Sequence, residues 1–338
     1  MKDIVSGWIE LSGLPKFTTS LFPFILGSVV AWVEGYAFNG PVLAISLLAV
    51  FLLSEFCFVL NASSIYADLN KKGIDVGRVE GTSTLHSTAI SGRFNAFVKG
   101  HITVKQADIG AYLCVVAAIP LGVLLQVHFK TGYLTLPLGL LGIFIAYSYS
   151  RGPRLSYHGL GEIALTTGVG WLTVFSGYYL QTQQVSWLPT IVALPWVIDV
   201  FKLKLTRNIP DFECDQMINR RNLAVRLGKR VTASLYAPLT ICAWLAFIPL
   251  LVLDLGVPYI FFVLLAFPIF FTAKSLMLIQ TFKKSLIKTG SEEDTKAFKK
   301  SLTKEQIGRI TKYAFSGMIL IPVALILIFV LTLVLPPL

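Results

Sequence analysis

The sequence predicts an all-α membrane protein, a single domain over residues 1–338 built as a bundle of about nine transmembrane helices. Hydrophobic side chains make up 55% of the residues and charged ones only 14%, whereas soluble proteins have about 45–50% and about 25%. The mean hydropathy is +0.71. A disordered chain is excluded because it needs low hydrophobicity, and a soluble globule is disfavoured because its surface needs more polar residues.

Apolar runs of the ~20 residues needed to cross the hydrocarbon core recur along the chain. Met1 to Lys16 lacks the pattern of a cleavable signal, so the first run is expected to stay as a helix. Repeated crossings fold into one bundle with one interior, which is why a single domain is expected. Nine spans are expected near 17–36, 40–61, 108–127, 133–150, 160–181, 186–206, 232–254, 257–281 and 311–336.

The basic residues test this number of spans, because nine spans place alternate connections on opposite sides. The side of the N-terminus holds 26 of the 29 Lys and Arg residues, and the opposite side holds only Lys130. The other two, Lys274 and Lys312, fall within spans. We therefore expect the N-terminus and the long loops in the cytoplasm and the C-terminus on the opposite side. The net charge of +11 then matches the anionic inner leaflet and requires no nucleic acid.

Acidic and amide side chains concentrate in the first long loop of that face. If the helix of the second span continues past Asn61, then Asn61, Asp68 and Asp75 follow one another at intervals of seven residues. Seven residues are two helical turns, so the three side chains share one face of the helix.

A second polar cluster follows the sixth span. Asp211 and Asp215 are one helical turn apart, and Asn208 precedes them by three residues. Stacked carboxylates repel unless a cation offsets their charge, and Mg²⁺ prefers one or two carboxylates together with phosphate oxygens. The two clusters therefore suggest a Mg²⁺-bound diphosphate. Basic residues nearby could supply the remaining countercharge; alternatively, they are solvated loop residues or contacts to lipid headgroups. They are Lys71, Lys72, Arg78, Lys202, Lys204, Arg207, Arg220 and Arg221.

These motifs resemble the UbiA superfamily of intramembrane prenyltransferases, and most closely its branch that acts on 1,4-dihydroxy-2-naphthoate in menaquinone synthesis. The segment RNIPDFECDQMINRRNLAVRLG is similar to the branch's NxxDxxxD motif with its basic pair and terminal arginine, Arg226. LPKFTTSLFPFILGSVVA resembles the family's first helix. The middle of the chain resembles the branch through Tyr149, Pro153, Gly159, Gly161, Glu162, Tyr178, Tyr179 and Gln181.

The first acidic motif departs from the family pattern. Where the family has Asn-Asp-x-x-Asp, this chain has Ser64-Ile65-Tyr66-Ala67-Asp68, with one extra residue before Gly73-Ile74-Asp75. Asn61 then either supplies the missing oxygen one turn earlier or only caps the end of the second span.

The resemblance implies an enzyme that transfers a prenyl group from a prenyl diphosphate to an aromatic acceptor. It implies Mg²⁺ as the cofactor, held by Asp68, Asp75, Asn208, Asp211 and Asp215. Glu162 and His158 are candidates for binding or deprotonating the acceptor, although a helix N-terminus also stabilises a carboxylate such as Glu162 on its own. The remaining candidates for substrate binding are Asn61, Lys71, Lys72, Arg78, Tyr149, Lys202 and Arg221.

Three alternatives stay open from the sequence. Another branch of the superfamily would use 4-hydroxybenzoate, an ether-lipid precursor or a tetrapyrrole as acceptor. A polytopic transporter is disfavoured because the acids gather at one face and not near the midplane. A scaffold without catalysis is supported only by the altered first motif.

Asp199 is either a site residue or the partner of Lys202 in a buried ion pair, and the pair is favoured.

The charge asymmetry predicts the sidedness of the loops. Single-cysteine labels in the loops at 128–132 and 182–186 are expected to react with an impermeant thiol reagent only from the non-cytoplasmic side, since basic loops are retained in the cytoplasm. Labelling of intact cells and of inverted vesicles measures this. Reaction from the cytoplasmic side at either loop would mean that the number of spans is wrong.

Overall fold

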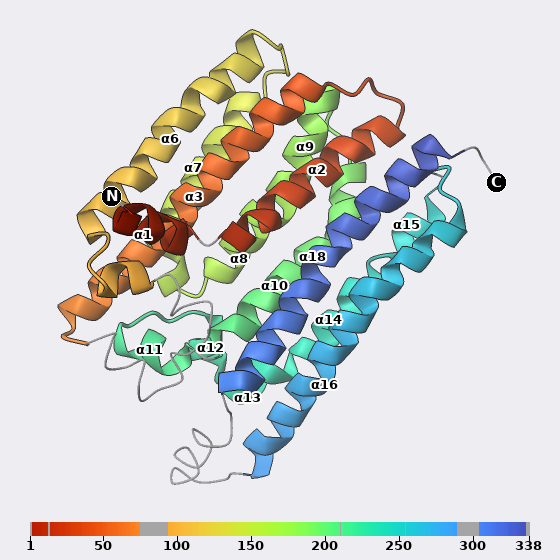
Figure 1. Cartoon of the computed structure of the whole chain (residues 1–338). Coiled ribbons are helices and arrows are strands. Elements are labelled where there is room, and N and C mark those ends of the chain that lie inside the picture. The colour runs from red at the N-terminus through yellow and green to blue at the C-terminus, as the bar shows by residue number, and fades with distance from the viewer. Residues whose placement is uncertain are drawn as a thin grey trace.

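The computed structural model describes residues 2–12, 14–74, 94–209, 211–253, 255–288 and 304–335. Within these ranges the regular structure is helical and contains no strand, so the predicted all-α class is confirmed. Figure 1 shows long helices lying side by side, with the short helices α11 and α12 at one end of the bundle and the C-terminus at the other.

The helical elements differ widely in length, from single turns to more than eight turns. In chain order they are α1 (Lys2–Ser12), η1 (Leu14–Phe17), α2 (Thr18–Val33), α3 (Gly40–Lys71), α6 (Val104–Val127), α7 (Thr135–Ser150), η3 (Leu155–Tyr157), α8 (Gly161–Leu165), η4 (Thr166–Leu172), α9 (Thr173–Thr182), α10 (Leu188–Asn208), α11 (Phe212–Met217), α12 (Leu223–Leu227), α13 (Lys229–Ser234), α14 (Tyr236–Leu245), α15 (Ile248–Val252), η5 (Tyr259–Leu265), α16 (Ala266–Lys288) and α18 (Lys304–Val334).

Long apolar helices recur throughout the described part of the chain. Two apolar helices, α2 and α7, are shorter than a full span. The two other predicted spans fall on α8–η4–α9 and on α10. The number nine stays a prediction. By length and composition, five helical stretches in the described ranges can cross a bilayer, namely Gly40–Lys71, Val104–Val127, Lys229–Val252, Tyr259–Thr281 and Arg309–Val334.

Helix α3 is longer than a bilayer requires. Its 32 residues reach about 48 Å at 1.5 Å per residue, whereas the hydrocarbon core is about 30 Å thick. Asn39 begins the helix by accepting a hydrogen bond from the Val42 amide at 3.0 Å. Gly73, at φ +69°, takes the left-handed conformation that commonly follows a helix end. The predicted continuation past Asn61 is confirmed, and it carries Asp68 to the end of the bundle where α11 and α12 lie.

The predicted span at 160–181 is not a uniform α-helix, because the π-helical segment η4 separates α8 from α9. Its sequence, TTGVGWL, contains two glycines, which favour the helix interior least after proline. The carbonyl of Val169 is satisfied from outside the backbone ladder, by the Thr173 hydroxyl at 2.7 Å and the Trp196 indole N–H at 3.2 Å. The wider turn thus keeps its polar groups paired inside the bundle.

Helices α2 and α9 cross at close range through small residues. A Cβ added at Gly27 would lie 1.9 Å from the Val174 carbonyl oxygen, and one added at Gly177 would lie 2.0 Å from the Phe24 carbonyl oxygen. The Ser28 hydroxyl donates across the same crossing to the Gly177 carbonyl at 3.0 Å. Close backbone approach and a hydroxyl hydrogen bond are the interactions that hold helices together in lipid.

We expect Gly27→Ala to destabilise the bundle by about 1–3 kcal/mol or more, because the new methyl group meets rigid backbone and the two helices must separate. Gly139→Ala on α7 is the matched control, since a Cβ there meets nothing within 4 Å. Thermal unfolding of both variants in detergent measures the difference. Equal melting temperatures for both variants would show that the crossing tolerates a wider separation.

Candidate active site

A polar cavity of about 120 Å³ lies at the end of the bundle that carries the motif residues. Its walls come from η1, α2, α3, α7, the α8–η4 helix, α10, α18 and the segment after α10. Its charged or amide lining residues are Lys16, Asn61, Lys204, Arg207, Asn208, Asp211 and Arg220.

Positive charge dominates this lining. Four basic side chains, Lys16, Lys204, Arg207 and Arg220, face a single lining carboxylate, Asp211. Burying charge without compensation is expensive, so a cavity with such an excess of cations favours an anionic ligand. Arg220 is buried and pairs with Asp215 through Nη1, but its Nε has no hydrogen-bond partner among the described residues.

The second acidic motif is divided between the cavity and its surroundings. Asn208 is the last residue of α10 and Asp211 directly precedes α11, so the two lie at the ends of different helices, and both line the cavity. Asp215 does not line it. Its carboxylate instead accepts hydrogen bonds from Arg220 Nη1 at 3.1 Å and from the Asn222 amide. Although burial opposes a charge on Arg220, the neighbouring Asp215 raises the pKa of its guanidinium, which therefore stays charged.

Asn208 is held by Glu162, the first acid of α8. The Asn208 Nδ2 group donates to Glu162 Oε1 at 2.6 Å, and the Leu223 amide donates to the same oxygen at 3.2 Å. The Oδ1 atom of Asn208 is buried and has no hydrogen-bond partner in the described part of the chain. An unpaired buried acceptor at a cavity wall is a position where a cation would be favourable.

Asn61 lines the same cavity from the middle of α3. Its Oδ1 accepts a hydrogen bond from the Ser150 hydroxyl at 3.0 Å. The alternative that Asn61 caps the end of the second span is wrong, because the helix runs ten residues further, to Lys71.

Asp68 lies two turns further along α3 and does not line the cavity. Its carboxylate forms an ion pair with Arg154 and accepts a hydrogen bond from the Tyr157 hydroxyl at 2.6 Å. The Arg154 guanidinium stacks 3.6 Å from the centre of the Tyr157 ring, and Arg220 lies 5.9 Å from it. Burial and the bond to Asp68 raise the pKa of Tyr157, so its hydroxyl remains a donor. The Tyr157 ring thus connects the first motif to the second.

The other predicted site residues lie in several places. Lys71, Lys72, His158 and Arg221 are exposed and outside the polar cavity. Asp75 and Arg78 lie outside the described residues.

Lys202 is buried on α10, also outside the polar cavity. It pairs with Asp199 at 2.5 Å, as favoured from the sequence.

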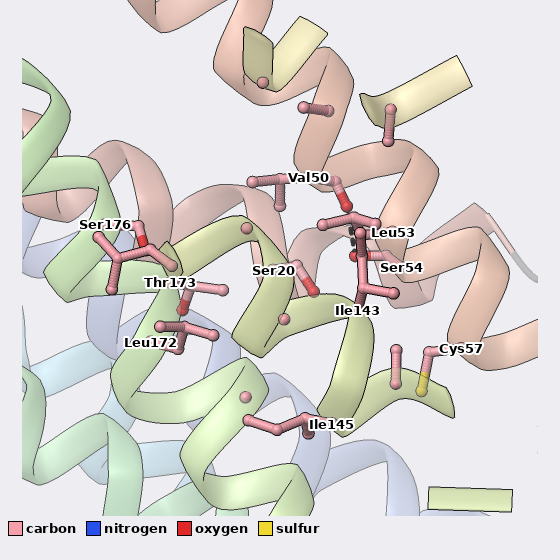
Figure 2. A pocket seen from close by; sticks show the side chains of 18 of the residues that line it. Ser20, Val50, Leu53, Ser54, Cys57, Ile143, Ile145, Leu172, Thr173 and Ser176 are labelled. Carbon is pink, nitrogen blue, oxygen red and sulfur yellow. Dashed lines mark hydrogen bonds between the residues drawn. The ribbon is translucent and has the colours of Figure 1, made fainter. Parts of the chain in front are cut away.

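A larger cavity of about 200 Å³ adjoins the polar one and has a mostly apolar lining. Figure 2 shows Leu53 of α3, Ile143 of α7 and Leu172 of η4 converging on it. Because five residues line both cavities, an elongated ligand can place a charged head in one and an apolar chain in the other. The shared residues are Cys57, Phe58, Tyr149, Leu165 and Val169.

Sequence reasoning did not select Arg154 or Tyr157 as site residues. Both lie in the YSRGPRLSYHGLGE segment, but their connection to Asp68 spans 86 and 89 residues of chain. Only the fold brings such distant groups together. In the sequence, the aromatic and basic residues that precede Glu162 are the feature that could have indicated Arg154 and Tyr157 as site residues.

Comparison with known proteins gives one family and a consistent fold. A model described as the UbiA prenyltransferase family matches residues 20–289. A 1,4-dihydroxy-2-naphthoate octaprenyltransferase of Bacillus subtilis (strain 168) is 27% identical over 260 residues, 77% of this chain and 78% of the relative. A protein of the same name from Escherichia coli (strain K12) is 26% identical over 229 residues, 66% of this chain and 68% of the relative.

Solved structures agree in fold. A UbiA homologue from Archaeoglobus fulgidus bound to GPP and Mg²⁺ superposes with a TM-score of 0.57 at 14% identity, covering 95% of this chain and 99% of that one. A UbiA homologue from Aeropyrum pernix K1 in its apo form gives 0.55 at 15% identity, covering 90% and 94%. At such identities the likeness concerns the fold alone.

We expect Tyr157→Phe and Asp68→Ala each to lower the free energy of unfolding by about 1.5–3 kcal/mol, the range for a hydrogen bond to a charged group. The double variant should lose less than the sum, because both changes remove the same bond. Denaturant unfolding in detergent measures this cycle. Tyr112→Phe on α6, where the ring is 45% exposed, serves as control. Full additivity would show that Tyr157 and Asp68 act independently.

Proposed function

The chain belongs to the UbiA prenyltransferase family, and from this premise we propose that it transfers a prenyl group from a prenyl diphosphate to an aromatic acceptor of the 1,4-dihydroxy-2-naphthoate type. The product class is a precursor of quinones or related lipids. The chain is an enzyme, a prenyltransferase, embedded in the membrane by several helices. The observation that carries the proposal is the junction of a basic cavity with an apolar one.

The polar cavity suits the diphosphate of the donor. Lys16, Lys204, Arg207 and Arg220 supply cationic donors around it, and the unpaired Nε of Arg220 gives a hydrogen bond that an anion would accept. Charge-assisted hydrogen bonds of this kind are about twice as strong as neutral ones. These residues would bind the diphosphate and offset the charge that it gains when the allylic carbon–oxygen bond breaks.

The donor set also fits Mg²⁺, a hard ion that prefers oxygen ligands and keeps phosphate oxygens and water in its coordination shell. Asn208, Asp211 and Asn61 would hold it, because all three line the cavity and the Asn208 Oδ1 atom is unpaired among the described residues. Bound there, Mg²⁺ supplies Lewis-acid stabilisation of the departing diphosphate. Asp215 contributes through Arg220, whose position it fixes.

The apolar cavity suits the prenyl chain and excludes water from the allylic cation. Hydrocarbon side chains offer this cation no nucleophile, and the ring acceptor then reacts in place of water. Tyr149 is placed where the two cavities meet, with Lys204 Nζ 5.8 Å from its ring centre. An aromatic face at this position favours a cation.

The acceptor class rests on the relatives and not on the cavities. The two bacterial relatives are named as 1,4-dihydroxy-2-naphthoate octaprenyltransferases, and they match across about two thirds or more of this chain. An electron-rich dihydroxynaphthoate ring attacks the allylic cation readily, with loss of a proton or of carbon dioxide from the ring. Benzoate, glycerol-ether and tetrapyrrole acceptors are the competing classes to be tested.

The direct test is Mg²⁺-dependent release of diphosphate from a long-chain prenyl diphosphate, with 1,4-dihydroxy-2-naphthoate or 4-hydroxybenzoate as acceptor. We expect release and prenylated product with the naphthoate, and Asp211→Ala should reduce both by about 100-fold or more, because a metal-ligating carboxylate acts on the transition state. The folded state should persist.

Asp3→Ala on the exposed N-terminal helix is the control and should retain full activity. Near-normal turnover by Asp211→Ala would remove the diphosphate site from this cavity. Turnover with 4-hydroxybenzoate but not with the naphthoate would support the prenyltransferase activity and contradict the proposed acceptor.

A further inference from the structure

Glu162 is completely buried, at 0% exposure, and lines neither cavity. A group that binds or deprotonates an acceptor must reach the ligand. Any effect of Glu162 on the reaction therefore passes through a neighbouring residue. The neighbour that meets the polar cavity is Asn208.

The contact between these two residues fixes which end of the Asn208 amide faces the cavity. A carboxylate offers only acceptors, whereas an asparagine amide carries a donor NH₂ on one side and an acceptor oxygen on the other. Glu162 Oε1 takes the NH₂ at 2.6 Å and also accepts the Leu223 amide at 3.2 Å. An inverted amide would set two acceptor oxygens against each other, so Oδ1 is directed away from Glu162.

The Oδ1 atom meets no donor in its buried position. It has no hydrogen-bond partner among the described residues, and its residue lies on the cavity wall together with Asp211. A buried oxygen without a partner has lost its hydrogen bonds to water. Only a hydrogen-bond donor or a cation can replace them. Water and a metal ion are the two candidates, and a metal diphosphate brings both.

We propose that Glu162 is a positioning residue: it holds the Asn208 amide in the one orientation that presents Oδ1 to the cation of a bound metal diphosphate. This inference rests on the proposed function. It differs from an acid–base role for Glu162, because the positioning role needs an acceptor oxygen and no proton transfer.

The first test separates these roles through two variants. Glu162→Gln keeps an acceptor oxygen for Asn208 and Leu223, whereas Glu162→Met removes it. Binding of Mn²⁺ together with inorganic diphosphate, followed by electron paramagnetic resonance on the purified protein, is the readout. We expect Glu162→Gln to bind within about threefold of wild type and Glu162→Met to bind about 10- to 100-fold more weakly, the range for loss of a group that orients a metal ligand.

The second test exchanges donor and acceptor. Asn208→Asp alone should weaken Mn²⁺ binding although it adds a carboxylate, because two carboxylates then meet inside the protein. Combining Asn208→Asp with Glu162→Gln should restore part of the binding, since the glutamine NH₂ in place of Oε1 now donates to the aspartate, whereas that position no longer accepts from the Leu223 amide. A residue that merely filled space would give no such rescue.

Glu34→Met is the control, because it removes another hydrogen-bonded glutamate, one that accepts from the Tyr178 hydroxyl beyond the far end of α2, and it should leave Mn²⁺ binding unchanged. Melting temperatures accompany each variant, and the donor–acceptor exchange decides the question if Glu162→Met does not fold.

Two results would overturn the inference while keeping the proposed function. One is loss of turnover in Glu162→Gln with Mn²⁺ binding intact. The other is tighter binding by Asn208→Asp alone. A wild-type protein that binds no Mn²⁺ with diphosphate would instead overturn the proposed function itself.

Discussion

Buried positive charge is the constraint on which the motif end of this bundle depends. A desolvated guanidinium costs several kcal/mol unless a partner compensates it, and four basic side chains line one small cavity. Arg220 is compensated within the protein by Asp215, which Asn222 holds in turn. Among the described residues the lining has one carboxylate, Asp211, so the basic side chains outnumber the acidic ones and an anionic ligand would add compensation. A site of this kind gains most when an anion arrives and gains further when that anion takes on more charge, which is what a departing diphosphate does.

The fold makes this arrangement possible by extending two helices beyond the apolar part of the bundle. Helix α3 carries Asn61 and Asp68 on one face, and α10 ends at Asn208 beside them. The glycine crossing holds α2 and α9, which both line the apolar cavity, in close contact, and the π-helical η4 lines that cavity as well. The polar and apolar cavities therefore lie within one helical bundle and meet at Tyr149.

Much of this organisation could be predicted from the sequence, because hydropathy and periodicity are local. The all-α class, the continuation of the second span past Asn61 and the pairing of Asp199 with Lys202 all followed from spacing. The division of the acidic motifs could not be predicted. Asp68 and Asp215 match the motif pattern as well as Asp211 does, yet Asp215 is engaged by Arg220, five residues further on, and Asp68 by Arg154 and Tyr157, which are 86 and 89 residues away in the chain. Tertiary contacts of this kind leave no periodic trace.

The altered first motif is explained by the same contacts. Ile65 packs in the apolar cluster formed with Leu69 and Phe97, so a carboxylate at this position would be buried among hydrocarbon. Asn61, one turn earlier on α3, instead lines the polar cavity. With Asp68 engaged by Arg154, the described residues that would offer oxygen ligands to a cation under the proposed function are Asn61, Asn208 and Asp211, two amides and one carboxylate. Amide oxygens carry no net charge, so under the proposed function the cation would be held more by its diphosphate than by the protein, and metal and donor should bind together.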